Sequence, residues 1–114
     1  MILSVQELVA QAKKSVECVS ADQAFSRENA TFIDVREPAE VADSPVENSL
    51  TIPRGVLEMN IAKHCTDVGM EIYLHCATGG RATLAAEQLQ RIGYKNVKAI
   101  SCQHADVCQA QKNQ

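Results

Sequence analysis

The feature that most constrains the fold is a strand–loop–helix–strand unit between residues 71 and 100. The apolar segment "EIYLHC" at 71–76 predicts a strand, and "NVKAI" at 96–100 predicts another. Between them, "GRATLAAEQLQRIG" predicts a helix, with Gly93 where a helix-ending glycine is expected. The apolar positions that share one face of this helix are Leu84, Ala85, Leu89 and Ile92. Two strands joined through a helix lie parallel in one sheet.

The rest of the chain continues this alternation. The patterns "SVQE" and "SADQ" are capping boxes and predict the starts of two helices. Further strands are expected at 16–20, 30–35 and 50–53, and further helices after Pro38, over 54–64 and over 103–111. The sequence therefore predicts an α/β fold, with a mostly parallel central sheet and helices on both faces.

Length and composition limit the architecture. A chain of 114 residues predicts a single domain over 1–114, with its core at about 4–108 and a polar C-terminal tail at 109–114. Hydrophobic residues make up 46% of the chain but aromatic residues only 4%, so the core is expected to be aliphatic.

Charge and hydropathy exclude several partners. The net charge is −3 and the basic residues form no run, so we expect no nucleic-acid partner. The sequence has no apolar run of about 18 residues, so no membrane partner is expected. The first 20 residues do not resemble a signal peptide, which predicts a cytoplasmic location. We expect no cofactor.

Five cysteines are an odd number, and without a secretory signal a disulfide framework is not expected. Most of them are interpreted as small buried side chains. A role as a resolving thiol stays open for Cys65, Cys102 and Cys108. The pattern Cys-x-His-x3-Cys at 102–108 and the pair His64–Cys65 match no standard zinc spacing, so no metal is expected.

The loop "CATGGR" has a composition that suits chemistry. Cys76 ends a strand and faces the start of the next helix, where the helix dipole and free N–H groups stabilise a thiolate. Gly79 and Gly80 allow successive N–H groups to converge on one point, and Arg81 adds a positive charge and a planar donor fork. The loop is therefore predicted to be an anion-binding cradle around a nucleophilic sulfur.

Two reactions use such a cradle: phosphoryl transfer through a cysteinyl-phosphate and sulfur transfer through a cysteine persulfide. The cysteine-phosphatase signature has five residues between Cys and Arg, whereas this loop has four. A smaller cradle favours a single terminal sulfur over a tetrahedral phosphate.

Three motifs give the chain a family resemblance. "CATGGR" at 76–81, "FIDVREPAE" at 32–40 and "IPRGVLE" at 52–58 follow one another in the order and spacing of the rhodanese-like sulfurtransferases, and "RIGYKNVKAI" at 91–100 is similar to the segment after their active-site helix. The resemblance covers roughly residues 4–100 and implies a rhodanese-like domain.

The resemblance also implies an activity, that of a thiosulfate sulfurtransferase (rhodanese) type of enzyme. Cys76 would attack a small sulfur-containing anion or a persulfide donor, carry the sulfur as a persulfide, and pass it to cyanide, a thiol or a thiol protein. The substrate-binding loop residues would be Ala77, Thr78, Gly79, Gly80 and Arg81.

Two segments depart from the family. "SPVENS" at 44–49 stands where the family usually has "GHIPGA". "SCQHADVCQ" at 101–109 stands where the family often has Gly-Gly and, a few residues later, Trp. Since these segments flank the mouth of the site in related proteins, we expect them to influence the choice of acceptor or partner.

Other polar residues are expected to be structural. Asp34 and Arg36 are predicted to pair and brace the loops near the site, Glu40 to act as a bracing partner, and His75 to pack on the face of its strand opposite to Cys76. Three alternatives stay open: a small cysteine-dependent phosphatase or arsenate reductase, a non-enzymatic sulfur-carrier or interaction module, and a redox sensor based on Cys76.

Overall fold

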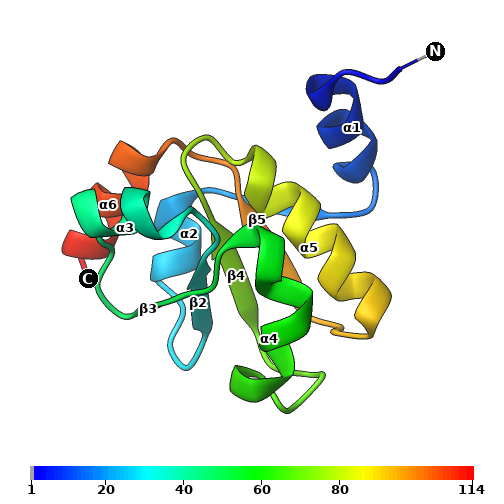
Figure 1. Ribbon diagram of the computed structural model, residues 1–114. Helices are drawn as coiled ribbons and strands as arrows, with labels where there is room; N and C mark the ends of the chain where they lie inside the picture. Colours follow the sequence, from blue (N-terminus) through cyan, green and yellow to red (C-terminus); the bar gives the residue numbers. More distant parts are fainter. Residues whose placement is uncertain (1) are drawn as a thin grey trace.

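The computed structural model describes residues 2–114, and this part of the chain forms a five-stranded sheet between helices (Figure 1). The strand order is β1-β5-β4-β2-β3, and each neighbouring pair is parallel. The predicted α/β class and the parallel sheet are confirmed. The strands are β1 (Glu17–Val19), β2 (Thr31–Asp34), β3 (Ser49–Thr51), β4 (Ile72–His75) and β5 (Val97–Ile100).

The helices begin where local sequence signals predict them. Ser4 and Ser20 cap helices α1 and α2, and each forms a complete capping box with the residue three positions later. Pro38 opens α3, where its missing N–H group costs no helical hydrogen bond. The helices are α1 (Val5–Ala12), α2 (Ala21–Phe25), α3 (Pro38–Asp43), the 3₁₀ turn η1 (Arg54–Val56), α4 (Leu57–His64), α5 (Gly80–Ile92) and α6 (His104–Lys112).

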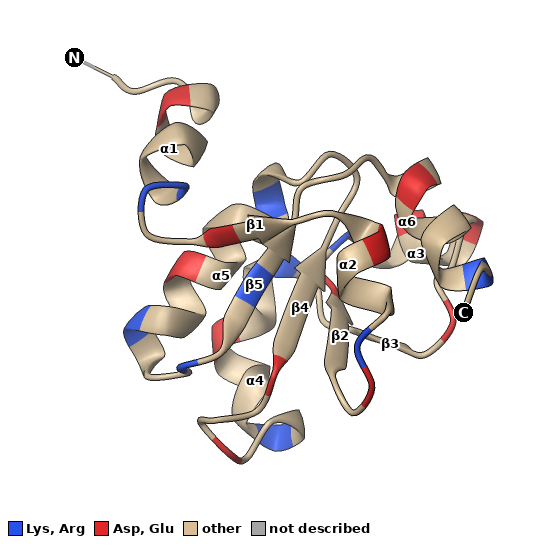
Figure 2. Cartoon of the chain, turned by 180° about the vertical axis from the view of Figure 1, so that it is seen from behind, with Lys and Arg blue, Asp and Glu red and all other residues tan. Residues whose placement is uncertain are grey.

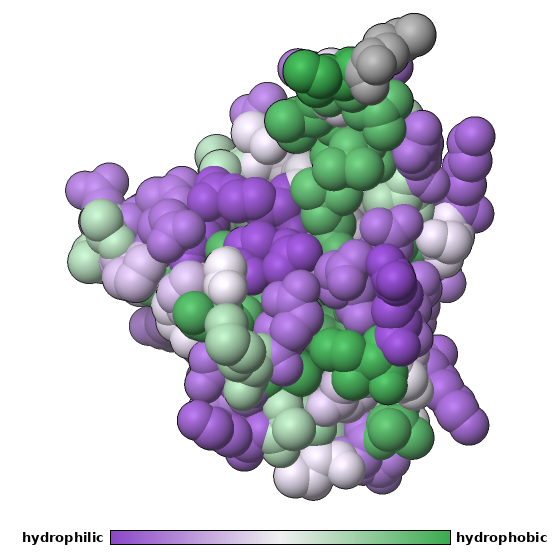
Figure 3. Space-filling model, turned by 45° about the vertical axis from the view of Figure 1, so that its right-hand side comes forward, coloured by the Kyte–Doolittle hydropathy of each residue, from purple (hydrophilic) through white to green (hydrophobic). Residues whose placement is uncertain are grey.

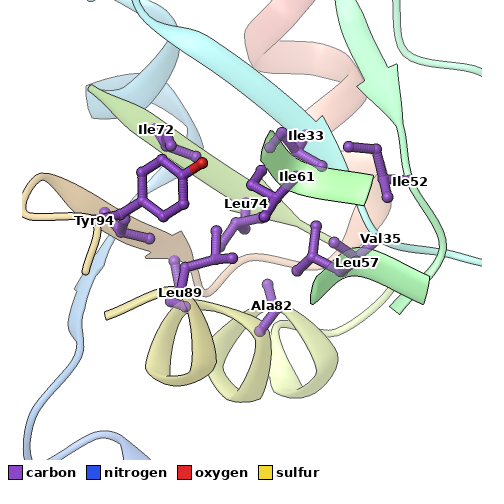
Figure 4. Close-up of a cluster of buried hydrophobic side chains, with 14 of the residues drawn as sticks. Ile33, Val35, Ile52, Leu57, Ile61, Ile72, Leu74, Ala82, Leu89 and Tyr94 are labelled. Atoms are coloured by element: carbon purple, nitrogen blue, oxygen red, sulfur yellow. The ribbon is translucent and has the colours of Figure 1, made fainter. Parts of the chain in front are cut away.

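Alternation along the central strand β4 divides the core into two layers. Ile72 and Leu74 belong to the larger cluster, which packs against α4 and α5, and Tyr73 belongs to the smaller cluster with α2 and α6. Figure 4 shows the larger cluster, where aliphatic side chains of the sheet meet those of the helices. Burying one such side chain, for example Leu89, stabilises the fold by about 2 kcal/mol.

Two details differ from the sequence prediction. Ile92, expected on the inner face of α5, is 51% exposed. The helix ends at Gly93, and Tyr94 folds back into the core, donating its backbone N–H to the Leu89 carbonyl. At the other end of the chain, α6 follows the predicted helix over 103–111 and continues to Lys112, but Ala110, in the expected polar tail, is buried.

The surface is mixed in charge and carries one apolar protrusion. Lys, Arg, Asp and Glu lie interspersed over the helices and connecting segments (Figure 2). Apolar side chains gather on the N-terminal segment and α1 (Figure 3), where Ile2, Leu3, Val5 and Leu8 are exposed. Among residues 2–114, no helix is both long and apolar enough to cross a membrane.

Candidate active site

The two predicted motifs meet at one edge of the sheet. Asp34, the last residue of β2, is the register partner of His75, the last residue of β4. Cys76 and the segment 34–36 therefore both follow the carboxyl ends of neighbouring parallel strands, where sites of open α/β sheets are built. Cys76 and the 34–36 segment therefore lie at the same edge of the sheet.

Cys76 lies beneath its loop and is only 1% exposed. Its sulfur accepts hydrogen bonds from the backbone N–H groups of Gly79, at 3.1 Å, and Ala82, at 3.3 Å. Both donors belong to the start of α5, where N–H groups have no helical partner and the helix dipole is positive. The arrangement stabilises negative charge on the sulfur. Ala82 is a donor that the loop motif did not indicate, because it lies one residue beyond the arginine.

Gly79 holds the loop in shape through a conformation that favours glycine. Its φ is +97°, and a Cβ atom there would lie 3.0 Å from the backbone Cα of Ser101. Its carbonyl accepts from the backbone N–H of Thr83, at 2.9 Å, and from the Thr83 hydroxyl, at 2.7 Å. The loop is thus packed tightly against the segment that follows β5.

Arg81 is held by an acidic partner from α3. Its guanidinium donates to both carboxylate oxygens of Glu40, at 2.7 and 2.9 Å. This bidentate pair, together with the backbone N–H of Glu37, lowers the pKa of Glu40 to about 2, and it raises the pKa of Arg81. The charge that Arg81 brings to the loop is therefore largely neutralised by Glu40.

Asp34 and Arg36 form a buried ion pair next to the loop. Arg36 donates to both carboxylate oxygens of Asp34, with a shortest distance of 2.7 Å, and is 3% exposed. It also donates to the carbonyls of Glu40, at 3.2 Å, and Ser44, at 2.7 Å. The pair braces the segment that carries the partner of Arg81.

His75 packs on the side of β4 that faces Phe25, with 6.3 Å between the ring centroids. Its Nε2 lies 2.8 Å from the Ser49 hydroxyl, and its Nδ1 finds no hydrogen-bond partner among residues 2–114. Burial lowers the pKa of His75 to about 4, with Arg36 contributing and Asp34 opposing. A neutral, enclosed imidazole of this kind has no geometry for proton transfer at Cys76.

A hollow of about 400 Å³ lies beside the loop. The loop side consists of Thr78, Gly79 and Gly80, and the α1 side is mixed, with apolar side chains next to Gln6 and Lys13. This hollow places the outer surface of the loop within reach of a small molecule, whereas the Cys76 sulfur itself lies deeper.

The remaining cysteines are free thiols in different settings. Cys65 is buried among apolar groups, and burial raises the pKa of its thiol. Cys102 accepts from the backbone N–H of Ala21 at 3.3 Å. Cys108 lies 3.2 Å from His104 Nε2, a contact that sequence reasoning missed although the spacing of four residues on a helix could have indicated it. The described residues hold no group of three or more His, Cys, Asp or Glu side chains placed to bind a metal.

Comparison with known proteins identifies the family of the chain. The sequence profile of the rhodanese-like domain matches residues 18–102. The chain belongs to the rhodanese-like domain family. A tRNA sulfurtransferase from Histophilus somni (strain 2336) is 30% identical over 103 residues, which cover 87% of this chain and 21% of that protein. The chain thus spans about a fifth of that relative's length.

Solved structures agree with the fold. The polysulfide-sulfur transferase homodimer of Wolinella succinogenes is 27% identical, with a TM-score of 0.71 and coverage of 87% of this chain and 77% of that one. A protein of unknown function from Rhodopseudomonas palustris, described as a possible tyrosine phosphatase, has a TM-score of 0.81 and covers 96% of this chain and 92% of its own. At 21% identity, this second likeness concerns the fold alone.

Proposed function

We propose that the protein is a sulfurtransferase that carries a sulfane sulfur as a persulfide on Cys76. The observation that supports this most is the sulfur of Cys76, buried at the start of α5 and accepting N–H groups from Gly79 and Ala82. The names of related proteins, a tRNA sulfurtransferase and a polysulfide-sulfur transferase, support the same reaction class.

The reaction has two displacement steps. The Cys76 thiolate attacks the outer sulfur of thiosulfate or of a persulfide, a new S–S bond forms, and sulfite or a thiolate leaves. A nucleophilic acceptor, a thiol or cyanide, then attacks the outer sulfur of the Cys76 persulfide, and the Cys76 thiolate leaves. In the second step, the Gly79 and Ala82 N–H groups stabilise the charge that returns to the sulfur.

The loop supplies the remaining requirements. Residues 77–81 would surround the position of a terminal sulfur, and the N–H groups of Gly79 and Ala82 are placed to stabilise the thiolate that attacks. His75, neutral and on the opposite side of β4, serves as support for the strand end. Since Arg81 is paired with Glu40, the site discriminates less in favour of dianionic donors such as thiosulfate than an unpaired arginine would.

Intact-mass measurement after incubation with thiosulfate or with a hydropersulfide tests the proposal. We expect a gain of one sulfur atom that peptide mapping places on Cys76, that cyanide removes, and that Cys76→Ser lacks at this site. Hydrolysis of an aryl phosphate together with no sulfur adduct from any donor would overturn the proposal in favour of a phosphatase.

Turnover distinguishes an enzyme from a carrier. An enzyme releases thiocyanate repeatedly when thiosulfate and cyanide are both supplied, and a carrier keeps the sulfur until a specific partner takes it. We expect multiple turnovers. A single stoichiometric transfer would show that the domain acts as a sulfur carrier.

A further inference from the structure

A second thiol, outside the Cys76 loop, has an imidazole partner. His104 and Cys108 lie one turn apart on α6, with 3.2 Å between Nε2 and Sγ. The same Nε2 lies 2.9 Å from the hydroxyl and 3.1 Å from the carbonyl oxygen of Ser44, which comes from the segment after α3. A thiol, an imidazole and a hydroxyl, three groups that are common in reactive sites, therefore lie together. Ser44 and His104 are 60 positions apart in the sequence.

The surroundings decide where the imidazole hydrogen lies. The Ser44 carbonyl oxygen can only accept, so Nε2 must carry a hydrogen to contact it favourably. Nδ1 of His104 is buried without a hydrogen-bond partner among residues 2–114, and an N–H group there would be a costly unpaired donor. The single Nε2–H group thus lies among three acceptors, the two Ser44 oxygens and the Cys108 sulfur, and a Cys108 thiolate would compete for it better than a thiol does.

His104 is fixed in place from two sides. Its backbone N–H donates to the carbonyl of Ala77 in the Cys76 loop, at 2.8 Å. The Ser44 carbonyl that it contacts also accepts from Arg36, at 2.7 Å. Because His104 is already ordered by these contacts, its imidazole loses little further side-chain entropy when Nε2–H donates to the sulfur.

Space for a reactant lies next to the sulfur. A cavity of about 420 Å³ is lined by Cys108, by Ser44, Pro45 and Val46 before β3, and by Lys112 one turn further along α6, with Glu47 also at its wall. Cys108 itself is half-buried, so its sulfur is reachable from this cavity, in contrast to the fully buried Cys65.

We propose that Cys108 is a second nucleophilic thiol, which takes a sulfane sulfur from a hydropersulfide or polysulfide in this cavity while His104 holds its thiolate. The Cys108 thiolate attacks the outer sulfur of R–S–SH, the bond between the two donor sulfurs breaks, and R–S⁻ leaves and takes a proton from water. Cys108 becomes Cys108–S–SH, and the step needs no oxidant because the transferred sulfur is already at the sulfane level. The donor class is that of the proposed function, but the site operates without Cys76.

The test uses the full chain with Cys76→Ser, so that failure of the Cys76 mechanism cannot hide or mimic the result. The protein is incubated with glutathione persulfide, and peptide mapping follows the gain of one sulfur at each remaining cysteine over time. We expect Cys108 to be modified at least about tenfold faster than Cys18 and Cys102, which are also half-buried but contact no imidazole.

Variants at His104 separate its role from simple accessibility. His104→Leu fills the same space without a donor and should slow Cys108 to the rate of Cys102, whereas His104→Gln keeps an N–H donor and should retain part of the advantage. The matched control is His64→Leu on the exposed side of α4, which should change nothing. The comparison among Cys108, Cys18 and Cys102 uses the chain that retains His104, so it does not depend on whether a variant of α6 folds. Equal rates at the three cysteines would overturn the proposal. An unchanged Cys108 rate in a folded His104→Leu chain would do the same.

Discussion

Cys65 and Cys76 are equally buried, at 1% exposure each, but lie at opposite ends of helices. Cys65 caps the C-terminus of α4, and its backbone N–H donates to the Ile61 carbonyl. Cys76 lies before the N-terminus of α5, and N–H groups of that helix point at its sulfur. The two thiols therefore experience helix dipoles of opposite sign.

The consequence is a difference in chemistry that exposure alone would not reveal. Burial among apolar groups raises the pKa of the Cys65 thiol, since nothing nearby compensates for the lost hydration of a thiolate. At Cys76, hydrogen bonds from Gly79 and Ala82 replace water. We therefore propose that partners at the helix end, rather than accessibility, decide which of these two buried cysteines reacts.

The largest effect on sulfur transfer is expected when the two cysteines are substituted one at a time. Cys76→Ser should lower sulfur transfer by at least about 10³-fold, because an alcohol does not ionise in the cradle. Cys65→Ala should keep transfer within about twofold and cost about 1–2 kcal/mol in the free energy of unfolding, from the cavity it leaves. Thiocyanate release and urea unfolding measure the two quantities. Substantial transfer in Cys76→Ser would remove the basis of the comparison.

The second prediction concerns the backbone that aims the N–H groups at Cys76. Gly79→Ala combines a positive φ with a contact of 3.0 Å to the Ser101 backbone, so the loop must shift. We expect a loss of about 2–4 kcal/mol in stability and a fall of about 10²-fold in transfer, since the donors move off the sulfur.

Gly93 provides the matched control for Gly79. Its φ is also positive, at +129°, but an added Cβ atom meets nothing within 4 Å among the described residues. Gly93→Ala should cost about 1–2 kcal/mol in stability and leave transfer unchanged. Equal losses of activity in the two variants would mean that general destabilisation, not loop geometry, controls the reaction.

The third prediction uses His75, which directly precedes Cys76 but lies on the other side of β4. Its pKa in the folded protein is about 4, below the ordinary value of 6.5, because burial disfavours the imidazolium. The unfolded chain therefore binds the proton more readily, and stability should fall by up to about 3 kcal/mol as the pH drops from 6.5 to 4. Above pH 6.5 this contribution is fully present.

Urea unfolding at several pH values measures this slope. His75→Gln should flatten the curve between pH 6.5 and 4, and His64→Gln, a change at an exposed histidine, should leave the curve as it is. If the free energy of unfolding of the wild-type chain stayed constant between pH 6.5 and 4, the description of His75 as a neutral, enclosed imidazole would be wrong.

The fold and the central cysteine were accessible from sequence because they depend on local patterns. Capping boxes at Ser4 and Ser20, the helix-ending Gly93 and the strand before Cys76 are each signalled within a few residues. The hydrogen-bond donors of a short βα loop are its own backbone N–H groups. An anion-binding cradle could therefore be predicted from "CATGGR" without knowledge of contacts to distant segments.

Contacts between distant segments were not accessible in this way. The pairing of Arg81 with Glu40 joins residues 41 positions apart, and that of His104 with Ser44 joins residues 60 positions apart. Whether Ile92 is covered depends on where Tyr94 turns back, and no periodicity within α5 encodes that. The roles assigned to the loop residues stay predictions until the variants are measured.

The smallest effect is expected at the rim of the Cys76 cradle, where Glu40 neutralises Arg81. Glu40→Gln removes the negative charge but retains an amide oxygen that can accept the Glu37 N–H. The freed guanidinium should attract thiosulfate, lowering its KM about three- to tenfold with little change in kcat, whereas the KM of a hydropersulfide with a single charge or less should move far less. Because both side chains are more than a third exposed, stability should change by less than about 1 kcal/mol.

Glu58→Gln is the matched control, since Glu58 pairs with Arg54 on the surface at a similar exposure. Steady-state kinetics with the two donors, at low and physiological salt, distinguishes the local field of Arg81 from general surface charge, because both variants change the net charge by the same amount. A thiosulfate KM that rises in Glu40→Gln, or that falls equally in Glu58→Gln, would show that Glu40 is a brace of the loop and not a determinant of donor charge. The N–H groups at Cys76 would then act alone in selecting the donor.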